Sequence, residues 1–124
     1  FAKQLLDTGR VGWVASEELE KPLGGFVQNK DSISVAMDPL DGSSNITTNN
    51  PLGSIFGIWR GELPQKGSQQ IASVFVTYGP TLTLTLAESG IVNQYVELRD
   101  GKDSGRFVLA YEGMKIPEMN LRET

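Results

Sequence analysis

A strictly alternating run of threonine and leucine, TLTLTLA at residues 81–87, restricts the fold more than any other feature of this chain. Because successive side chains of a strand point to opposite faces of a sheet, this alternation predicts a strand with one apolar and one polar face. The mostly apolar segment before it, residues 71–78, stops at a Gly-Pro turn signal. We interpret the leucines as one side of a core, and a functional role for the threonines is the weaker alternative.

Shorter strand patterns, separated by turns rich in glycine and proline, make up most of the remaining chain. The first residues, FAKQLLDTG, resemble the last turns of a helix that Gly9 closes at its C-cap position. The predicted loops are residues 21–30 and 60–70, and a further turn is predicted at 100–105. These patterns predict an α/β (α+β) segment with a mainly mixed or antiparallel sheet and a flanking helix. The predicted strands are 11–15, 32–37, 52–59, 71–78, 81–87, 94–98 and 106–111.

The composition excludes several classes of function. A net charge of −4 and the lack of a basic run argue against nucleic acid as a partner. The sequence has no cysteine and no histidine, which excludes disulfides, thiolate metal sites, histidine-ligated zinc and histidine acid–base catalysis. No apolar run reaches the 18 residues of a membrane span. Any chemistry must therefore use carboxylates, hydroxyls, lysines or a metal bound by oxygen.

The stretch DPLDGSSN, beginning at Asp38, carries the clearest chemical signal. It follows an apolar strand pattern, so Asp38 and Asp41 are expected close together at a sheet edge, on either side of a turn that Pro39 restricts. The same turn is expected to present the carbonyl of Leu40 outward. Two carboxylates and a carbonyl are hard oxygen ligands, which suit Mg²⁺ or Mn²⁺ better than zinc or copper.

Directly after the second acid comes a segment suited to bind an anion. Gly42, Ser43 and Ser44 offer backbone N–H groups and hydroxyls at the expected start of a helical turn, followed by Asn45. A carboxylate cluster beside a phosphate cradle is the arrangement needed for metal-assisted hydrolysis of a phosphate ester. The alternative interpretation is a solvated turn capped by its own aspartate and serine side chains.

A second acidic motif, Ser16-Glu17-Glu18, also follows a short apolar strand pattern. Adjacent residues at the end of a strand point to opposite sides, so at most one glutamate can face Asp38 and Asp41. The other would act at a distance from the metal or in proton transfer. By itself, a pair of glutamates is most often solvated surface.

Taken together, these motifs resemble class I fructose-1,6-bisphosphatase, within the lithium-sensitive phosphatase superfamily that includes inositol monophosphatase. The resemblance covers essentially the whole chain, and the SSNI ending of its most specific motif favours the sugar-bisphosphatase branch. It rests on SEE at 16–18, DPLDGSSNI at 38–46, GSIFGIW at 53–59, TYGPTLTL at 77–84 and FVLAYEGMKIP at 107–117.

The resemblance implies a fold, a reaction and a set of residue roles. The fold would be a layered α/β arrangement, and the reaction would be Mg²⁺-dependent hydrolysis of the 1-phosphate of fructose 1,6-bisphosphate, a step of gluconeogenesis. Water would attack in line with two-metal assistance and without a phosphoenzyme. Metal ligands would be Glu17, Asp38, Asp41 and the Leu40 carbonyl, with Glu17 and Asp38 bridging and Glu18 positioning or deprotonating the water. Asp41, Gly42, Ser43, Ser44 and Asn45 would bind the substrate.

The chain also departs from the family pattern. Thr47 stands where the family usually has aspartate, and the family's further metal-binding acid and 6-phosphate residues have no counterpart. We therefore expect residues 1–124 to form a single partial domain of a longer protein, with exposed apolar faces and no activity alone. That parent would be a homo-oligomer in the cytoplasm, with a plastid as the alternative. Sedoheptulose 1,7-bisphosphatase, and a non-catalytic metal- or phosphate-binding remnant or interaction module, remain as alternative functions.

Overall fold

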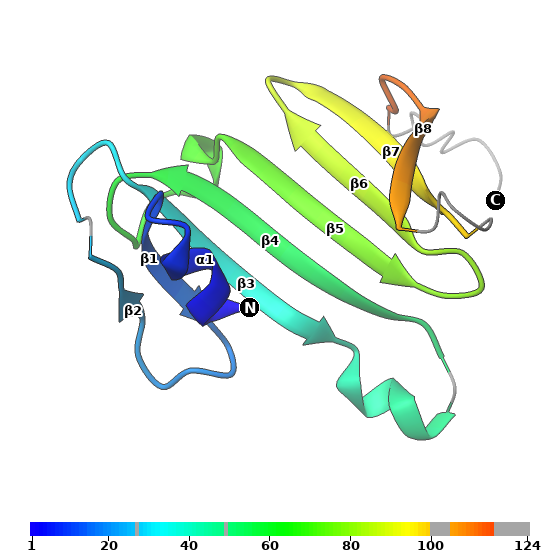
Figure 1. The fold of residues 1–124 in the computed structure, drawn as a ribbon, viewed down its shortest axis with the longest axis horizontal. Coiled ribbons are helices and arrows are strands. Elements are labelled where there is room, and N and C mark those ends of the chain that lie inside the picture. The colour runs from blue at the N-terminus through cyan, green and yellow to red at the C-terminus, as the bar shows by residue number, and fades with distance from the viewer. Residues whose placement is uncertain (27, 49, 100–104, 116–124) are drawn as a thin grey trace, which may run out of the picture.

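The computed structural model describes residues 1–26, 28–48, 50–99 and 105–115. Within these residues the chain forms one mixed sheet of eight strands with an α-helix and two short 3-10 helices (Figure 1). This confirms the predicted α+β class and the flanking helix. The elements are α1 (Ala2–Asp7), β1 (Val11–Ser16), β2 (Leu23–Gly24), β3 (Ile33–Asp41), η1 (Ser43–Thr48), β4 (Leu52–Arg60), η2 (Gly67–Gln69), β5 (Ala72–Tyr78), β6 (Thr83–Glu88), β7 (Ile91–Leu98) and β8 (Arg106–Tyr111).

The strand order is β2-β1-β3-β4-β5-β6-β7-β8, so only the first strands depart from chain order. Strands β1 and β3 run parallel, whereas every other neighbouring pair is antiparallel. A parallel pair needs a crossover connection, because a tight hairpin turn reverses the direction of the chain. That crossover is the segment from 17 to 32, which includes β2 on the far side of β1.

Strands β5 to β8 form a meander in which the alternation of residues 81–87 has the predicted role. Leu84 pairs with Val76 and Leu86 pairs with Val74, so the leucines share one face with the valines of β5. The threonines lie on the other face. Strand β7 begins at Ile91, three residues earlier than predicted, and it pairs with β8 as expected. The turn predicted between them lies, except for its last residue, outside the described residues.

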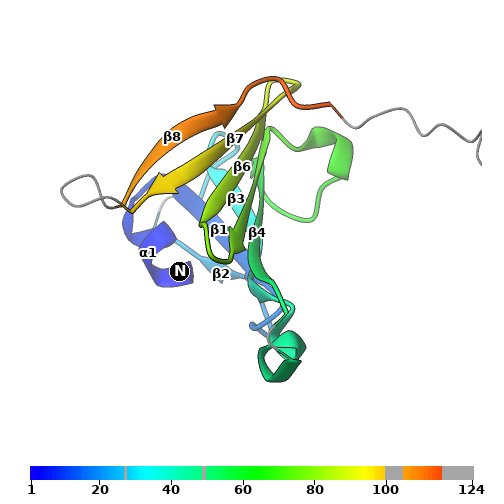
Figure 2. The same cartoon turned by 90° about the vertical axis from the view of Figure 1, so that its right-hand side faces the viewer.

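The buried core is small and lies under α1. Its buried apolar residues are Val11, Val14, Val35 and Met37, all from β1 and β3. The helix packs its Leu5 and Leu6 side chains against this cluster. Figure 2 shows α1 on one side of the sheet and the green loop that carries η2 on the other. The loop between β4 and β5 therefore covers part of the face opposite α1.

Large apolar side chains are exposed elsewhere, as expected for this segment. Ile55 of β4 and Phe75 of β5 are exposed on the face opposite α1, and Leu109 and Tyr111 are exposed on β8. Ile55 and Phe75 are paired neighbours, so together they form an apolar surface suited to contact other parts of a protein. The prediction of exposed apolar faces is thus confirmed.

Two local predictions need correction. Thr8, not Gly9, is the C-cap of α1, and Gly9 follows it with a φ of 70°, where glycine is favoured. The loop predicted at 21–30 contains the short strand β2, because Leu23 and Gly24 pair with β1. Within the described residues, no helix is long and apolar enough to cross a membrane.

Candidate active site

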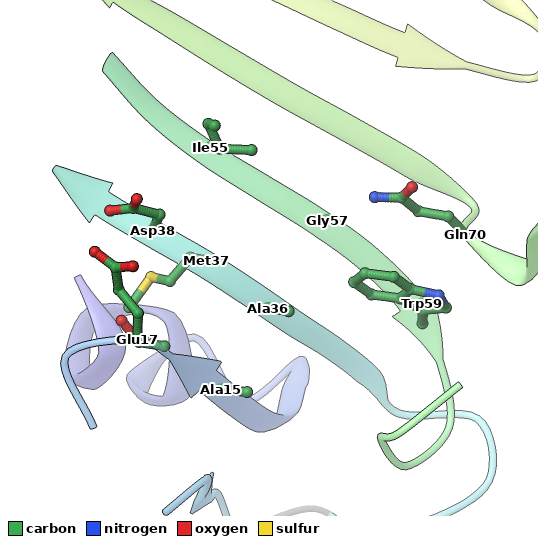
Figure 3. A pocket seen from close by; sticks show the side chains of 10 residues that line it. Ala15, Glu17, Ala36, Met37, Asp38, Ile55, Gly57, Trp59 and Gln70 are labelled. Carbon is green, nitrogen blue, oxygen red and sulfur yellow. The ribbon is translucent and has the colours of Figure 1, made fainter. Parts of the chain in front are cut away.

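The parallel pairing of β1 with β3 brings the two acidic motifs together. Ser16, the last residue of β1, pairs with Met37, so Glu17 and Asp38 follow at neighbouring positions on the two strands. The carboxyl ends of parallel strands meet at the same edge of a sheet. Figure 3 shows the carboxylates of Glu17 and Asp38 pointing toward one another at this edge.

Glu17 and Glu18 lie in a tight turn after β1, and this corrects the expectation of a strand end. The backbone N–H of Leu19 donates to the Ser16 carbonyl over 3.1 Å, and the N–H of Glu18 donates to the Ser16 hydroxyl over 3.4 Å. Both glutamates are exposed, and Glu17 lines the pocket beside Asp38. Glu17 faces Asp38, in line with the expectation that at most one glutamate would, but a turn and not strand alternation separates it from Glu18.

Strand β3 does not end at Asp38 but continues through Pro39 to Asp41 with a bulge. Asp38 pairs with Ile55 and Asp41 pairs with Gly53, so β3 spends one more residue than β4 over this stretch. In a regular strand, residues three apart face opposite sides. The extra residue in the bulge shifts the alternation by one position, so Asp38 and Asp41 lie on the same face of the sheet. Proline is tolerated here because a bulge interrupts the ladder.

Negative charge is concentrated at this end of the two strands. The Asp38 carboxylate, above all, raises the pKa of the exposed Glu17 side chain from its ordinary value, followed by slight desolvation and then by the charge of Glu18. A side-chain hydrogen bond to Asp38 and the charge of Asp41 act in the same direction. Such crowding favours either a proton or a cation between the carboxylates.

The donor set fits a hard cation in its chemistry, while its geometry is incomplete. Carboxylate oxygens are the ligands that Mg²⁺ and Mn²⁺ prefer. Within the described residues, however, no group of three His, Cys, Asp or Glu side chains is arranged to hold a metal. Glu17 and Asp38 converge, and Asp41 lies on the same face with an exposed side chain. Leu40 is also exposed, and its N–H donates to Asp38 Oδ1 over 3.0 Å.

The segment after Asp41 forms the predicted helical turn. Gly42 has a φ of 79°, and an added Cβ would come within 3.1 Å of Asn45 Nδ2, so glycine is needed there. The N–H of Asn45 donates to the Gly42 carbonyl over 2.7 Å, which opens η1. Ser43 and Ser44 are exposed at its start, and η1 projects from the end of β3 away from the sheet (Figure 1). The first serines are therefore accessible beside Asp41.

A pocket of about 470 Å³ extends from the acidic pair along the face opposite α1. Its far end is formed by Trp59 and Gln70, which sequence reasoning did not identify (Figure 3). Gly57 forms the floor of the pocket under the Trp59 ring. An added Cβ at this position would come within 2.5 Å of that ring. A signal was present in GSIFGIW, where Gly53, Gly57 and Trp59 share one face of a strand.

Comparisons with known proteins agree with this fold. The chain matches the family described as fructose-1-6-bisphosphatase, N-terminal domain, over residues 1–112. A class 1 fructose-1,6-bisphosphatase of Natronomonas pharaonis is 42% identical over 98 residues, covering 79% of this chain and 34% of the relative. One of Methanocorpusculum labreanum is 38% identical over 117 residues, covering 94% of this chain and 35% of the relative.

A solved structure supports the same assignment. The Leishmania major fructose-1,6-bisphosphatase in holo form superposes with a TM-score of 0.77 at 31% identity, over 93% of this chain and 38% of that one. The chain thus spans about a third of the length of the curated relatives it matches, 34% and 35% for the two named. The match over residues 1–112 and the shared fold together assign this chain to the fructose-1,6-bisphosphatase family, in the region of its N-terminal domain.

Proposed function

We propose that the protein carrying this chain is a metal-dependent phosphatase that hydrolyses the 1-phosphate of fructose 1,6-bisphosphate to fructose 6-phosphate and phosphate. The observation that carries this proposal is the convergence of Glu17 and Asp38 at the ends of two parallel strands, with Asp41 on the same face. The exposed serines after Asp41 support it, because they lie next to the carboxylates. The names of the relatives favour fructose over sedoheptulose bisphosphate.

Mg²⁺, with Mn²⁺ as a substitute, is the cation that this donor set favours. Glu17, Asp38, Asp41 and the Leu40 carbonyl would hold it, in line with the resemblance. A divalent cation bound there supplies Lewis-acid polarisation of the phosphoryl group and lowers the pKa of the attacking water. Asp41 has to turn toward the Glu17–Asp38 pair, which its exposed side chain permits.

The chain's own residues have separate tasks in the proposed reaction. Gly42, Ser43 and Ser44 bind the 1-phosphate through N–H and O–H donors, and Asn45 lies near the sugar. Glu18 accepts a proton from the water while the oxygen of that water attacks phosphorus. The bond between phosphorus and the oxygen on C1 breaks, and the departing oxygen takes a proton from solvent water. The hydroxyls act as binders, so no covalent enzyme intermediate forms.

The test is phosphate release by the full-length protein, measured with fructose 1,6-bisphosphate in the presence and absence of Mg²⁺. Asp41→Ala is expected to reduce turnover by about 100-fold or more, because the transition state loses several kcal/mol of stabilisation. Each ~1.4 kcal/mol lost lowers the rate tenfold. Glu62→Ala is the matched control, since this exposed acid lies beyond the other end of β4.

Several outcomes would decide between the alternatives. Equal turnover of sedoheptulose 1,7-bisphosphate would broaden the substrate assignment. Metal-independent turnover, or an Asp41→Ala variant as active as the control, would refute the proposed mechanism. Mg²⁺ binding without turnover of either sugar would favour a non-catalytic role. The homo-oligomeric state and the cytoplasmic location stay predictions.

A further inference from the structure

Ser54 of β4 is a polar side chain with no exposed surface, and its hydroxyl has two partners. Its Oγ lies 2.7 Å from the carbonyl oxygen of Pro39 and 2.7 Å from the hydroxyl of Tyr78. A carbonyl can only accept, so Ser54 gives its single proton to Pro39. The Tyr78 hydroxyl must then donate to Ser54. The direction of the chain of hydrogen bonds is therefore from Tyr78 through Ser54 to Pro39.

This chain of hydrogen bonds ends inside the bulge that separates the two aspartates. Ser54 lies between Gly53 and Ile55, the residues that pair with Asp41 and Asp38. A bulge disrupts the ladder locally, so its backbone groups need other partners. The Ser54 hydroxyl supplies one of these partners from the opposite strand.

A single peptide unit is held on both sides. The carbonyl of Pro39 and the N–H of Leu40 belong to the same peptide group, which is planar. Ser54 binds the carbonyl, and Asp38 Oδ1 accepts from the N–H over 3.0 Å. With both polar groups engaged, the plane of this peptide cannot rotate without breaking a hydrogen bond. Its orientation sets the direction of the chain between the two carboxylates.

We propose that Tyr78 and Ser54 are positioning residues that fix the Pro39–Leu40 peptide, and through it the relative placement of Asp38 and Asp41 for a divalent cation. This inference rests on the proposed function, because that function assigns the cation to these carboxylates. Neither side chain is offered as a ligand: both act through the backbone of the bulge. Hydrogen bonds that orient metal ligands typically change affinity or activity 10–100-fold when they are removed.

The structure offers a closely matched control in Ser34. This serine is also fully buried, lies on the neighbouring strand β3, and donates to a backbone carbonyl, that of Gly61. It lies four residues before Asp38 and well away from the bulge in the strand register. Ser34→Ala and Ser54→Ala each leave one backbone carbonyl without its side-chain donor, and Ser54→Ala also leaves the Tyr78 hydroxyl without its acceptor, so the loss of stability should be larger at Ser54.

The experiment measures Mg²⁺ affinity of the full-length protein by titration calorimetry, without substrate. Ser54→Ala should weaken Mg²⁺ binding about 10-fold or more, and Tyr78→Phe by a smaller factor, about threefold. Ser34→Ala should leave it unchanged. Ser54→Thr keeps the hydroxyl and should restore binding toward that of the parent. If Ser54→Ala does not fold, Tyr78→Phe removes only one oxygen and carries the test.

A second readout is independent of the metal. In the metal-free protein, hydrogen exchange at the Leu40 N–H should be faster in Ser54→Ala than in Ser34→Ala, because the peptide is then held from one side only. Equal exchange rates, or an equal loss of Mg²⁺ affinity in both alanine variants, would overturn the positioning role.

The inference and the proposed function fail in different ways. If Mg²⁺ binding depends on Asp41 but is the same in Ser54→Ala and Tyr78→Phe as in the parent, the positioning role is wrong and the proposed function stands. If the parent protein binds no Mg²⁺, or if Asp41→Ala binds Mg²⁺ as tightly as the parent, the proposed function is wrong. The positioning role toward a cation is then wrong as well.

Discussion

The half of the sheet formed by β1, β3 and β4 differs from the meander of β5 to β8 in burial and in connection. The first half contains the fully buried side chains of Val14, Ser34 and Ser54 and packs against α1. Its central strands β1 and β3 pair in parallel across a crossover. In the meander each strand pairs with the next along the chain, and none of the described residues in these strands is buried.

The contrast shows where this chain places its chemistry. All the candidate ligands lie at one end of the first half, where non-consecutive strands meet and a buried core supports them. The meander consists of local hairpins with half-exposed faces, and Tyr78 of β5 connects it to the site through a hydrogen bond to Ser54. We infer that the first half positions the residues of the site and that the meander stabilises this arrangement through contacts with β4.

The largest expected effect is a difference in stability between matched valines of the two halves. Val14→Ala should lower the free energy of unfolding of the 124-residue chain by about 2–3 kcal/mol, because it leaves a cavity in the buried core. Val74→Ala, in the half-exposed meander, should cost about 1 kcal/mol or less. Urea denaturation measures both. Equal losses would contradict the difference in packing between the halves.

A substitution at Gly57 tests whether the Trp59 ring packs against the floor of the pocket in the first half. Gly57→Ala should cost about 1–2 kcal/mol and displace the Trp59 ring, since the new Cβ would lie 2.5 Å from it. In a Trp13→Phe background, where Trp59 is the sole reporter, emission should shift to longer wavelength.

The control for this variant is Gly67→Ala in η2. An added Cβ at Gly67 would meet nothing within 4 Å, so stability and emission should stay near those of the parent. A Gly57→Ala variant that also behaves like the parent would show that the Trp59 ring does not rest on the strand in solution.

The smallest effect concerns the charge at the site itself. Asp38→Asn removes the carboxylate that most raises the pKa of Glu17, while the amide oxygen can still accept from the Leu40 N–H. The metal-free chain should therefore become slightly more stable, as substitutions at functional sites often do. The variant should also lose any rise in melting temperature on adding Mg²⁺.

Thermal unfolding with and without excess Mg²⁺ checks both parts of this prediction, with Glu62→Gln as the control for removing one exposed acid. A destabilised metal-free Asp38→Asn, beside an unchanged control, would mean that Asp38 serves the fold more than a cation.

Much of the fold could be predicted because its signals are local. The alternation at 81–87, the turn signal before it and the helix closed near Gly9 each depend on neighbouring residues, and the structure has all three. The acidic motifs were also identifiable by residue type and by their position after apolar strands. The bulge in β3 was not predicted, because residue types alone do not show which residues of β4 pair with Asp38 and Asp41. The role of Ser54 was missed for the same reason, whereas the alternation in GSIFGIW could have indicated Trp59.

The sequence by itself determined which residues alternate, which oxygen ligands follow the strands, and that neither histidine nor cysteine could contribute. Periodicity and composition are properties of residues that are neighbours in the sequence, so they can be determined without knowing the contacts of the fold. Only the tertiary structure decided that Glu17 faces Asp38, that Asp41 shares their face, and that Ser54 holds the bulge. Those facts depend on the register between strands far apart in the chain, where a shift of one residue turns every side chain to the other face.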